Sequence, residues 1–477
     1  MSGAEDGGKV VTSTTEPAGG PGLRDGVLSI PEVLAQSVAN MAPSAAMALL
    51  PLLVFLNAGN GSWLSFVIAL VLMLLVGVCV AQFATRINAS GSFYSWVRTS
   101  LGPAAGHTAG SGLLLGYIAT GMATVLGFGI YGADLLTRLG VASGISAVQV
   151  VLYVVCLIGA VLVAISDVRI SVRTSMVLEA ISVAAILAIC AAVYFERGAV
   201  LDTAQLSLRD SGLGGITVGV VLAIFAFVGF ESAGSLGSEA RNPERSIGRA
   251  ILWSCGLVGL FYVFVVYTQV YGFSGTTPGF AKSSAPLPDL ADLVHLPVLA
   301  PIVDLGIVCS MFACTLACVN AASRVLFTMA RDGLAARPLA RVHLRHHTPH
   351  LAMWTVGVPM LVVPALFLLL GNDAIALNGW IGTVAVFGFM LGYCLAAVGV
   401  VRFLRSRGEP SALTTVLAVL SVAAMLFVFW ANWIPQHPAN GVFPALTTPY
   451  NVLPYVFLVW VVGNLLWYAV ARRRAEN

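Results

Sequence analysis

The sequence predicts an all-α integral membrane protein with twelve transmembrane helices. Only 9% of its 477 residues are charged, whereas 58% are hydrophobic. Runs of about 20 apolar residues, the length of helix that crosses a bilayer core, recur along the chain. Lipid cannot satisfy backbone polar groups, so these runs are expected to be helices. The predicted spans are residues 34–57, 62–85, 106–137, 147–166, 175–195, 214–238, 248–273, 297–330, 351–370, 378–404, 411–430 and 450–471.

The basic residues predict the orientation of these spans. All but four of the 24 Lys and Arg residues fall on one side of the predicted membrane; the other side holds Arg138, Arg197, Arg209 and Lys282. Because Lys and Arg accumulate in cytoplasmic loops, we expect a multi-pass protein of the cell membrane with both termini in the cytoplasm. Residues 1–28, rich in Gly, Ser and Thr, are predicted to be a disordered cytoplasmic tail, and residues 472–477 a second short tail.

Several classes of protein are disfavoured by what the chain lacks. The eight cysteines all fall in apolar segments, so no disulfide framework is expected. The sequence contains no G-x-x-x-x-G-K-[ST] motif, so energy should come from gradients rather than from ATP. A histidine cluster between spans eight and nine is interpreted as a solvated loop, and Cys314 and Cys318 as packing residues. We therefore expect no enzyme activity, cofactor, metal or nucleic acid, but a small-molecule substrate and contact with lipid. The oligomeric state stays open.

Two of the spans contain residues that interrupt a helix. The first span holds Asn40-Met41-Ala42-Pro43-Ser44-Ala45, and proline removes an amide hydrogen and clashes with the preceding turn. The sixth holds Gly229-Phe230-Glu231-Ser232, in which glycine permits unwinding and a carboxylate lies in an apolar segment. Helices 1 and 6 are therefore predicted to be broken in mid-membrane.

A broken helix offers chemistry that an intact one does not. Its freed amide groups attract an anion, and its freed carbonyl groups attract a cation or an ammonium group. One break can therefore hold both ends of a zwitterion. The two breaks lie five helices apart, the spacing of two inverted five-helix repeats. The alternative interpretation is structural: Pro43 as an ordinary kink, and Glu231 as a residue held by a hydrogen bond.

Other polar residues leave alternatives open. Glu179, in the fifth span, either forms an ion pair with Arg173 at the cytoplasmic rim or takes part in proton coupling. The third span is rich in glycine, which allows close packing of helices. The glycines can also leave space for a substrate, and in that case Tyr117 or Thr120 would reach the site. Asp134 is interpreted as part of a solvated helix end.

Four stretches of the sequence resemble the amino acid–polyamine–organocation superfamily. They are residues 225–233 (FAFVGFESA), 239–247 (EARNPERSI), 320–333 (NAASRVLFTMARDG) and 41–46 (MAPSAA). The resemblance implies a LeuT-type 5+5 inverted repeat. It places a ten-helix transport core at residues 29–404, with repeats at about 29–200 and 210–404, and peripheral helices 11 and 12 at residues 405–471. It also implies a substrate site formed by helices 1, 3, 6, 8 and 10.

The resemblance further implies roles for single residues. The pattern around Glu231 is similar to that of arginine/agmatine antiporters, which implies proton and substrate handling by Glu231, a substrate-packing ring at Phe225 and a wall at Val228. Two departures stand out. Residues 43–46 (PSAA) replace a glycine-rich turn that offers amide groups to a substrate carboxylate, and Ser182 lies where some proton-coupled relatives carry a lysine.

Together these observations predict a secondary active transporter, a permease for a small amino acid or amine that works by alternating access. We expect coupling to protons or exchange, with sodium left open. The alternatives are an organic cation or polyamine transporter, or a channel or transport-dead sensor of the same fold. Coupling is assigned to Glu231 and Glu179. The predicted substrate-binding residues are Asn40, Met41, Ala42, Pro43, Ser44, Ala45, Ala46, Phe225, Val228, Gly229, Phe230 and Glu231.

Overall fold

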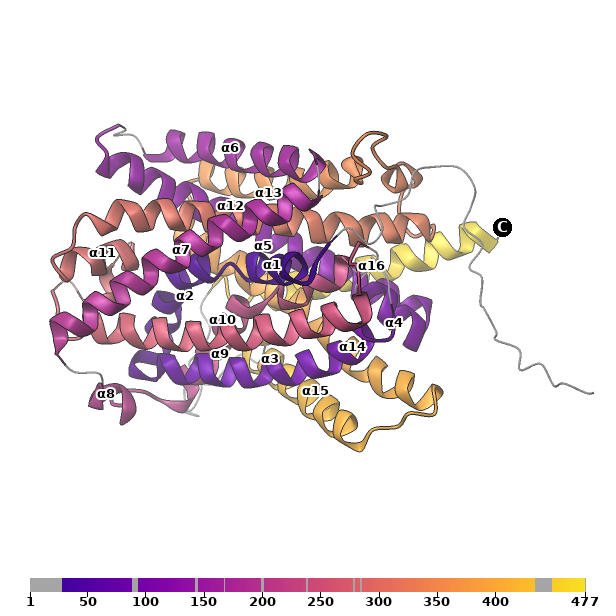
Figure 1. The fold of residues 1–477 in the computed structure, drawn as a ribbon. Coiled ribbons are helices and arrows are strands. Elements are labelled where there is room, and N and C mark those ends of the chain that lie inside the picture. Colours follow the sequence, from indigo (N-terminus) through magenta and orange to yellow (C-terminus); the bar gives the residue numbers. More distant parts are fainter. Residues whose placement is uncertain are drawn as a thin grey trace, which may run out of the picture.

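The protein is a bundle of long helices. The computed structural model describes residues 28–87, 93–141, 145–166, 168–198, 201–236, 239–277, 279–283, 285–433 and 448–476. Within these ranges all regular structure is helical, apart from one isolated β-bridge between Leu28 and Ala240. The long helices run side by side along a common direction (Figure 1). The all-α prediction is thus confirmed for the described residues.

The α-helices are α1 (Ile30–Met41), α2 (Pro43–Ala58), α3 (Ser62–Ala84), α4 (Phe93–Leu101), α5 (Pro103–Arg138), α6 (Ile145–Ser166), α7 (Val168–Arg197), α8 (Thr203–Leu206), α9 (Leu213–Phe227), α10 (Pro243–Phe273), α11 (Pro286–Leu293), α12 (Leu299–Arg331), α13 (His350–Leu369), α14 (Ala374–Ser406), α15 (Ala412–Trp433) and α16 (Leu453–Glu476). Four short 3-10 helices complete the described chain: η1 (Gly59–Gly61), η2 (Phe230–Leu236), η3 (Phe280–Lys282) and η4 (Arg337–Ala340).

Most of the long helices can cross a membrane. Within the described residues, 11 helical segments are long and apolar enough to do so, and the first, Ile30–Ala84, contains α1, α2 and α3. The protein is therefore a multi-pass membrane protein. Of the predicted tail at 1–28, only Leu28 lies within the described residues, and its backbone N donates to the Glu239 carbonyl at 2.9 Å.

The helices differ in how much of their surface the bundle covers. The most apolar windows of α5, α12 and α14 are 72%, 72% and 67% buried, whereas those of α15 and α16 are only 28% and 17% buried. Their outer faces carry exposed Val419, Leu426, Val459 and Leu466, as expected where lipid replaces water. Helices α15 and α16 therefore lie at the periphery, and α5, α12 and α14 form the interior.

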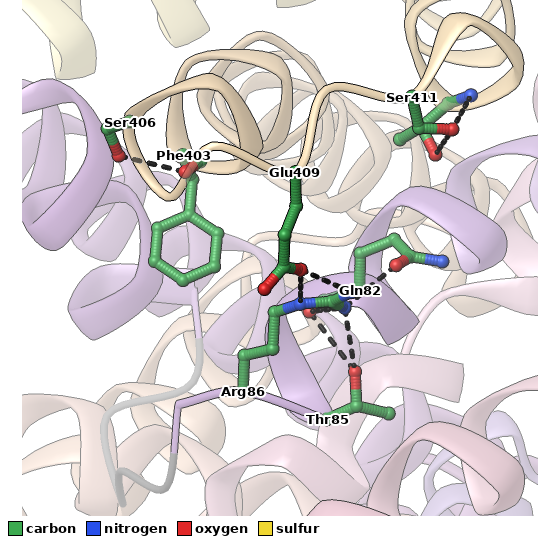
Figure 2. A network of polar contacts seen from close by, with 8 residues as sticks. Gln82, Thr85, Arg86, Phe403, Ser406, Glu409 and Ser411 are labelled. Carbon is green, nitrogen blue, oxygen red and sulfur yellow. Dashed lines mark hydrogen bonds and ion pairs between the residues drawn. The ribbon is translucent and has the colours of Figure 1, made fainter.

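The two ends of the bundle carry different connections. Helix α4 and the C-terminal end of α16 lie at one end, and α8 and α11 lie at the opposite end (Figure 1). Figure 2 shows a surface network that ties the end of α3 to the turn before α15. There Arg86 Nε donates to Glu409 Oε2 at 3.1 Å, and Arg86 Nη1 donates to Gln82 Oε1 at 2.8 Å. Both charged side chains are partly exposed, so this pair contributes little to stability.

Candidate functional site

The first interruption lies between α1 and α2. Helix α1 ends at Met41, and α2 begins at Pro43. Ala42 joins them with a φ of 45°, in the left-handed region that residues with a side chain rarely adopt. Pro43 has no amide hydrogen to continue the hydrogen bonding of α1. Main-chain polar groups are consequently turned toward neighbouring helices at this point.

The second interruption lies between α9 and η2. Helix α9 ends at Phe227, Val228 is extended, and Gly229 has a φ of 96°. Glycine is required here for two reasons. A side chain disfavours this φ, and a Cβ atom on Gly229 would lie 2.2 Å from Asn40 Nδ2. The second interruption is therefore in direct contact with the last turn of α1.

Hydrogen bonds hold the two interruptions together. Ser37 Oγ donates to the Phe230 carbonyl at 2.6 Å, and Ser37 Oγ in turn accepts from the Ala233 backbone N at 3.1 Å. Tyr262 Oη lies 2.9 Å from the Met41 carbonyl and 2.8 Å from the Ala226 carbonyl. The C-terminal ends of α1 and α9 thus meet at a shared tyrosine from α10.

A small cavity of about 40 Å³ lies beside this meeting point. It is lined by parts of α1, α2, α5, α9, α12 and α14, which correspond to predicted spans 1, 3, 6, 8 and 10. This volume is below that of typical small-molecule sites, so the lining has to move apart before a ligand of amino-acid size can bind. No lining residue is charged. The lining residues are Asn40, Met41, Ala42, Ala45, Ala46, Leu49, Leu50, Thr120, Ala123, Thr124, Phe225, Val228, Met311, Cys314 and Asn378.

The structure brings seven of the twelve predicted binding residues to this cavity: Asn40, Met41, Ala42, Ala45, Ala46, Phe225 and Val228. The other five do not line it: Pro43, Ser44, Gly229, Phe230 and Glu231. Pro43 and Gly229 shape the two interruptions instead. Phe230 is fully buried and packs against the Tyr393 ring, with 5.6 Å between ring centroids. Substrate binding by these residues stays a prediction.

Glu231 is fully buried behind the cavity, between two tyrosines. Its Oε1 accepts from Tyr117 Oη on α5 at 2.7 Å, and its Oε2 accepts from Tyr393 Oη on α14 at 2.8 Å. Glu231 therefore has a structural role, because it forms hydrogen bonds with two tyrosines. Its role in proton coupling stays a prediction. Tyr117, which the glycine-rich third span had placed within reach of the site, contacts this carboxylate and does not line the cavity.

Glu179 is also buried, and its partners lie on α2 and α12. Its Oε1 accepts from the backbone N of Ser44 at 2.9 Å and from Ser44 Oγ at 3.0 Å, and its Oε2 accepts from Ser310 Oγ at 2.5 Å. Ser310 Oγ also accepts from the backbone N of Ala45 at 3.1 Å. A carboxylate is favourable at the N-terminus of a helix. The predicted partner of Glu179, Arg173, has a side chain outside the described residues.

Other residues that the sequence singled out have local partners. The Ser182 hydroxyl donates to the Gly306 carbonyl on α12. Asp134 forms an ion pair with Arg138 at 2.8 Å, with both side chains partly exposed. Within the described chain, no group of three or more His, Cys, Asp or Glu residues is arranged to hold a metal ion.

Eight lining residues were not among the predicted binding set: Leu49, Leu50, Thr120, Ala123, Thr124, Met311, Cys314 and Asn378. The spacing of residues along a helix could have predicted some of these lining residues. Leu49 and Leu50 lie four residues after Ala45 and Ala46 and so share a face of α2. Thr120, which the glycine-rich third span had placed within reach of the site, lies four residues before Thr124 on α5.

The fold and the cavity together define a class of protein. A multi-pass helical bundle with a cavity beside two helix interruptions, lined by uncharged residues among those described, is typical of a membrane transporter for small molecules. A family model described as amino acid permease matches residues 28–462. The chain therefore belongs to the amino acid permease family of the amino acid–polyamine–organocation superfamily, whose members are transporters and not enzymes.

Individual relatives agree with this assignment. The chain is 29% identical to a branched-chain amino acid permease of Bacillus subtilis over 351 residues, which cover 69% of this chain and 72% of the relative. It is 25% identical to a branched-chain amino acid permease of Lactococcus lactis over 444 residues, covering 88% and 89%. It is also 24% identical to a methylthioribose transporter of Bacillus subtilis over 442 residues, covering 88% and 87%. The superfamily resemblance is thus confirmed.

Proposed function

We propose that this protein is a secondary active permease for a neutral amino acid and that it works by alternating access. The observation that carries the proposal is the cavity between the two interruptions, whose lining is largely apolar and contains no charged residue. A charged ligand side chain would lose its hydration there without gaining an ionic partner. The names of the two branched-chain amino acid permeases among its relatives support the same substrate class.

The finer topology in this proposal is a LeuT-type arrangement of twelve spans with both termini in the cytoplasm. The first apolar segment has 55 residues. A helix of that length spans about 80 Å at 1.5 Å per residue, more than twice the bilayer core of about 30 Å. Two crossings in that segment raise the number of spans from 11 to twelve. The distribution of Lys and Arg supports the orientation.

The interruptions suit the ammonium group of an amino acid. Helices α1 and α9 both end beside the cavity, at Met41 and Phe227. Each helix C-terminus carries about half a negative charge in its unpaired carbonyl groups. Two such ends converging on one cavity attract a cationic group without any acidic side chain. We place the ammonium group there, with Phe225 packing on the substrate.

A buried ion pair lies on the predicted cytoplasmic side of the bundle, and we assign it the role of a gate. Arg324 Nε on α12 donates to Glu239 Oε1 at 2.7 Å, and the side chains are 1% and 3% exposed. Arg324 Nη1 also donates to the Asn320 carbonyl at 3.0 Å. In the proposed cycle, opening toward the cytoplasm requires this pair to separate or to move as a unit.

Proton coupling through Glu231 and Glu179 is part of the proposal. Both are buried carboxyl groups within predicted spans, and buried ionisable residues at membrane depth commonly mark ion or proton pathways. Glu179 links α7 to α2 and α12, and Glu231 links η2 to α5 and α14. A change of protonation at either residue would alter contacts between helices that border the cavity.

Counterflow in liposomes tests the proposal. Purified protein is reconstituted with internal unlabelled leucine, and entry of labelled leucine is measured against competing amino acids and amines. We expect saturable counterflow that neutral amino acids inhibit and polyamines do not. Uptake of amines alone would establish an organic cation transporter, and flux without saturation or counterflow would establish a channel. Absence of any flux in a folded sample, across the whole panel, would indicate a sensor.

A further inference from the structure

We infer that the carboxylate group of the substrate is bound by the side chains of Asn40 on α1 and Thr120 on α5, and not by the backbone amides at the N-terminus of α2. This inference rests on the proposed function, because it concerns how an amino acid is held in the same cavity. It assigns the two residues as determinants of specificity for a carboxylate.

The N-terminus of α2 has no backbone donor to spare in this conformation. Its first residue, Pro43, has no amide hydrogen. The Ser44 amide donates to Glu179 Oε1 at 2.9 Å, and the Ala45 amide donates to Ser310 Oγ at 3.1 Å. The Ala46 amide donates to the Ala42 carbonyl at 2.8 Å. A substrate carboxylate could dock at this helix end only by displacing Glu179, whose negative charge would also repel it.

Two other donors in the cavity are unused. Asn40 Nδ2 and Thr120 Oγ1 are both buried and have no hydrogen-bond partner among the residues that the structure describes. Their residues are 2% and 5% exposed, and both line the cavity. The opposite atom of the Asn40 amide, Oδ1, accepts from the Cys318 thiol at 3.1 Å, which leaves Nδ2 as the free group.

The remaining polar groups of the lining are already paired. Thr124 Oγ1 lies 2.8 Å from Thr315 Oγ1 and 3.1 Å from the Gly121 carbonyl. Asn378 Nδ2 donates to the Ala123 carbonyl at 2.7 Å, and the Cys314 thiol donates to the Asn40 carbonyl at 3.2 Å. A buried donor without a partner is unfavourable. An acceptor supplied by the ligand would satisfy both Asn40 and Thr120.

A carboxylate matches these two donors better than a neutral acceptor does. It offers two oxygen atoms, and hydrogen bonds to a charged acceptor are about twice as strong as neutral ones. Asn40 belongs to the last turn of α1, the helix end beside which we place the ammonium group. The donor and acceptor groups are therefore adjacent, as are the two charged groups of an α-amino acid. In this arrangement Glu179 keeps its bonds to α2 while the substrate is bound.

Three variants test the inference by leucine counterflow. Thr120→Val removes one free donor at nearly constant volume, and Asn40→Asp replaces the other with a negative charge. The matched control is Thr137→Val, which removes an α5 hydroxyl that donates to the Ala133 carbonyl at 2.8 Å and does not line the cavity. We expect the concentration for half-maximal counterflow to rise about tenfold to a hundredfold in the first two variants and less than about threefold in the control.

Competition by leucinamide distinguishes a loss of carboxylate recognition from a general loss of transport activity. Leucinamide keeps the ammonium group and the side chain but has no carboxylate. In the unmodified protein it should compete at least about tenfold less well than leucine, and this preference should fall to within about threefold in Thr120→Val. If Asn40→Asp does not elute as a folded species, Thr120→Val alone decides the matter.

Two results would overturn the inference while leaving the proposed function intact. One is leucine counterflow in which Thr120→Val behaves as Thr137→Val does, with the preference over leucinamide unchanged. The other is a Glu179→Ala variant that binds leucine more tightly, since this would show that the released α2 amides receive the carboxylate. Failure of the unmodified protein to exchange any amino acid would instead overturn the proposed function.

Discussion

The two helix interruptions each have a buried glutamate beside them, but the two carboxylates bind different kinds of partner. Glu179 accepts hydrogen bonds from the backbone and hydroxyl of Ser44 and from Ser310, so it holds the main chain at the start of α2. Glu231 accepts from two tyrosine side chains, on α5 and α14, and also from the backbone N–H groups of Gly229 and Glu231 within its own interruption. The first carboxylate therefore fixes the position of a broken helix. The second joins its own interruption to two intact neighbouring helices.

Because the partners of the two carboxylates differ, we expect substitutions of Glu179 and Glu231 to have unequal effects. Serine hydroxyl groups rotate freely and can find local carbonyl groups when a partner is lost. A tyrosine hydroxyl on a buried ring has no such freedom. We therefore expect the interruption at Glu231 to be the more sensitive of the two. The predictions below test that order, beginning with the largest expected effect.

Glu231→Ala should have the largest effect. It leaves the hydroxyl groups of Tyr117 and Tyr393 without their acceptor, and each buried unpaired group costs about 1–3 kcal/mol. We expect leucine uptake to fall at least about a hundredfold, together with a lower melting temperature in detergent. The matched control Glu231→Gln can still pair with both hydroxyl groups, so it should keep counterflow but lose accumulation driven by a proton gradient. Undiminished proton-driven accumulation in Glu231→Gln would remove the coupling role.

Glu179→Ala should have an intermediate effect. It removes the cap at the N-terminus of α2, and loss of such a cap costs about 0.5–2 kcal/mol. We expect uptake to fall about tenfold. Glu179→Gln, which keeps an oxygen for the Ser44 amide, should retain most of the stability. Parallel thermal melts and uptake assays give the ranking, and a greater loss in Glu179→Ala than in Glu231→Ala would reverse the proposed order.

Ser310→Ala isolates one part of the first interruption. It removes the acceptor of the Ala45 amide and one of the three donors to Glu179. Two bonds are lost, each worth about 0.5 kcal/mol at the lower end of the usual range, so uptake should fall about fivefold. The measurement is the initial rate of counterflow at a low leucine concentration. An effect as large as that of Glu179→Ala would mean that Ser310, and not the carboxylate, positions α2.

Arg86→Ala should have the smallest effect. It shows how much uptake changes when a residue that does not line the cavity is replaced. The ion pair of Arg86 with Glu409 is partly exposed, and neither residue lines the cavity (Figure 2). Such exposed pairs contribute about 0.2–1 kcal/mol, so uptake should change by less than about twofold. A large loss of uptake here, measured at equal amounts of folded protein, would show that the link between α3 and the turn before α15 matters for transport.

The sequence predicted the parts of this site that depend on local chemistry. Apolar runs predict helices because lipid offers no partner for the backbone. The residues around Pro43 and Gly229 stood out because both disturb a regular helix, and α1 ends before Pro43 while α9 ends before Gly229. The polar character of Asn40 was equally visible at membrane depth.

Contacts between distant helices were not predictable in the same way. Ser44 and Ser310 lie 135 and 131 residues from Glu179, and which of them it meets depends on how α7 packs against α2 and α12. Sequence reasoning considered Arg173 because it is near in the chain. Met311 and Ala123 carry no signal that separates a cavity wall from ordinary helix packing.

The contact between Gly229 and Asn40 limits how descendants of this sequence can vary. A side chain at position 229 meets Asn40 at 2.2 Å, and the φ of 96° penalises that side chain even if Asn40 becomes smaller. A second mutation to a smaller residue at position 40 can relieve the steric clash but not the unfavourable φ at position 229. A population carrying Gly229→Ala under selection for growth should therefore recover by true reversion to glycine more often than by suppression at position 40.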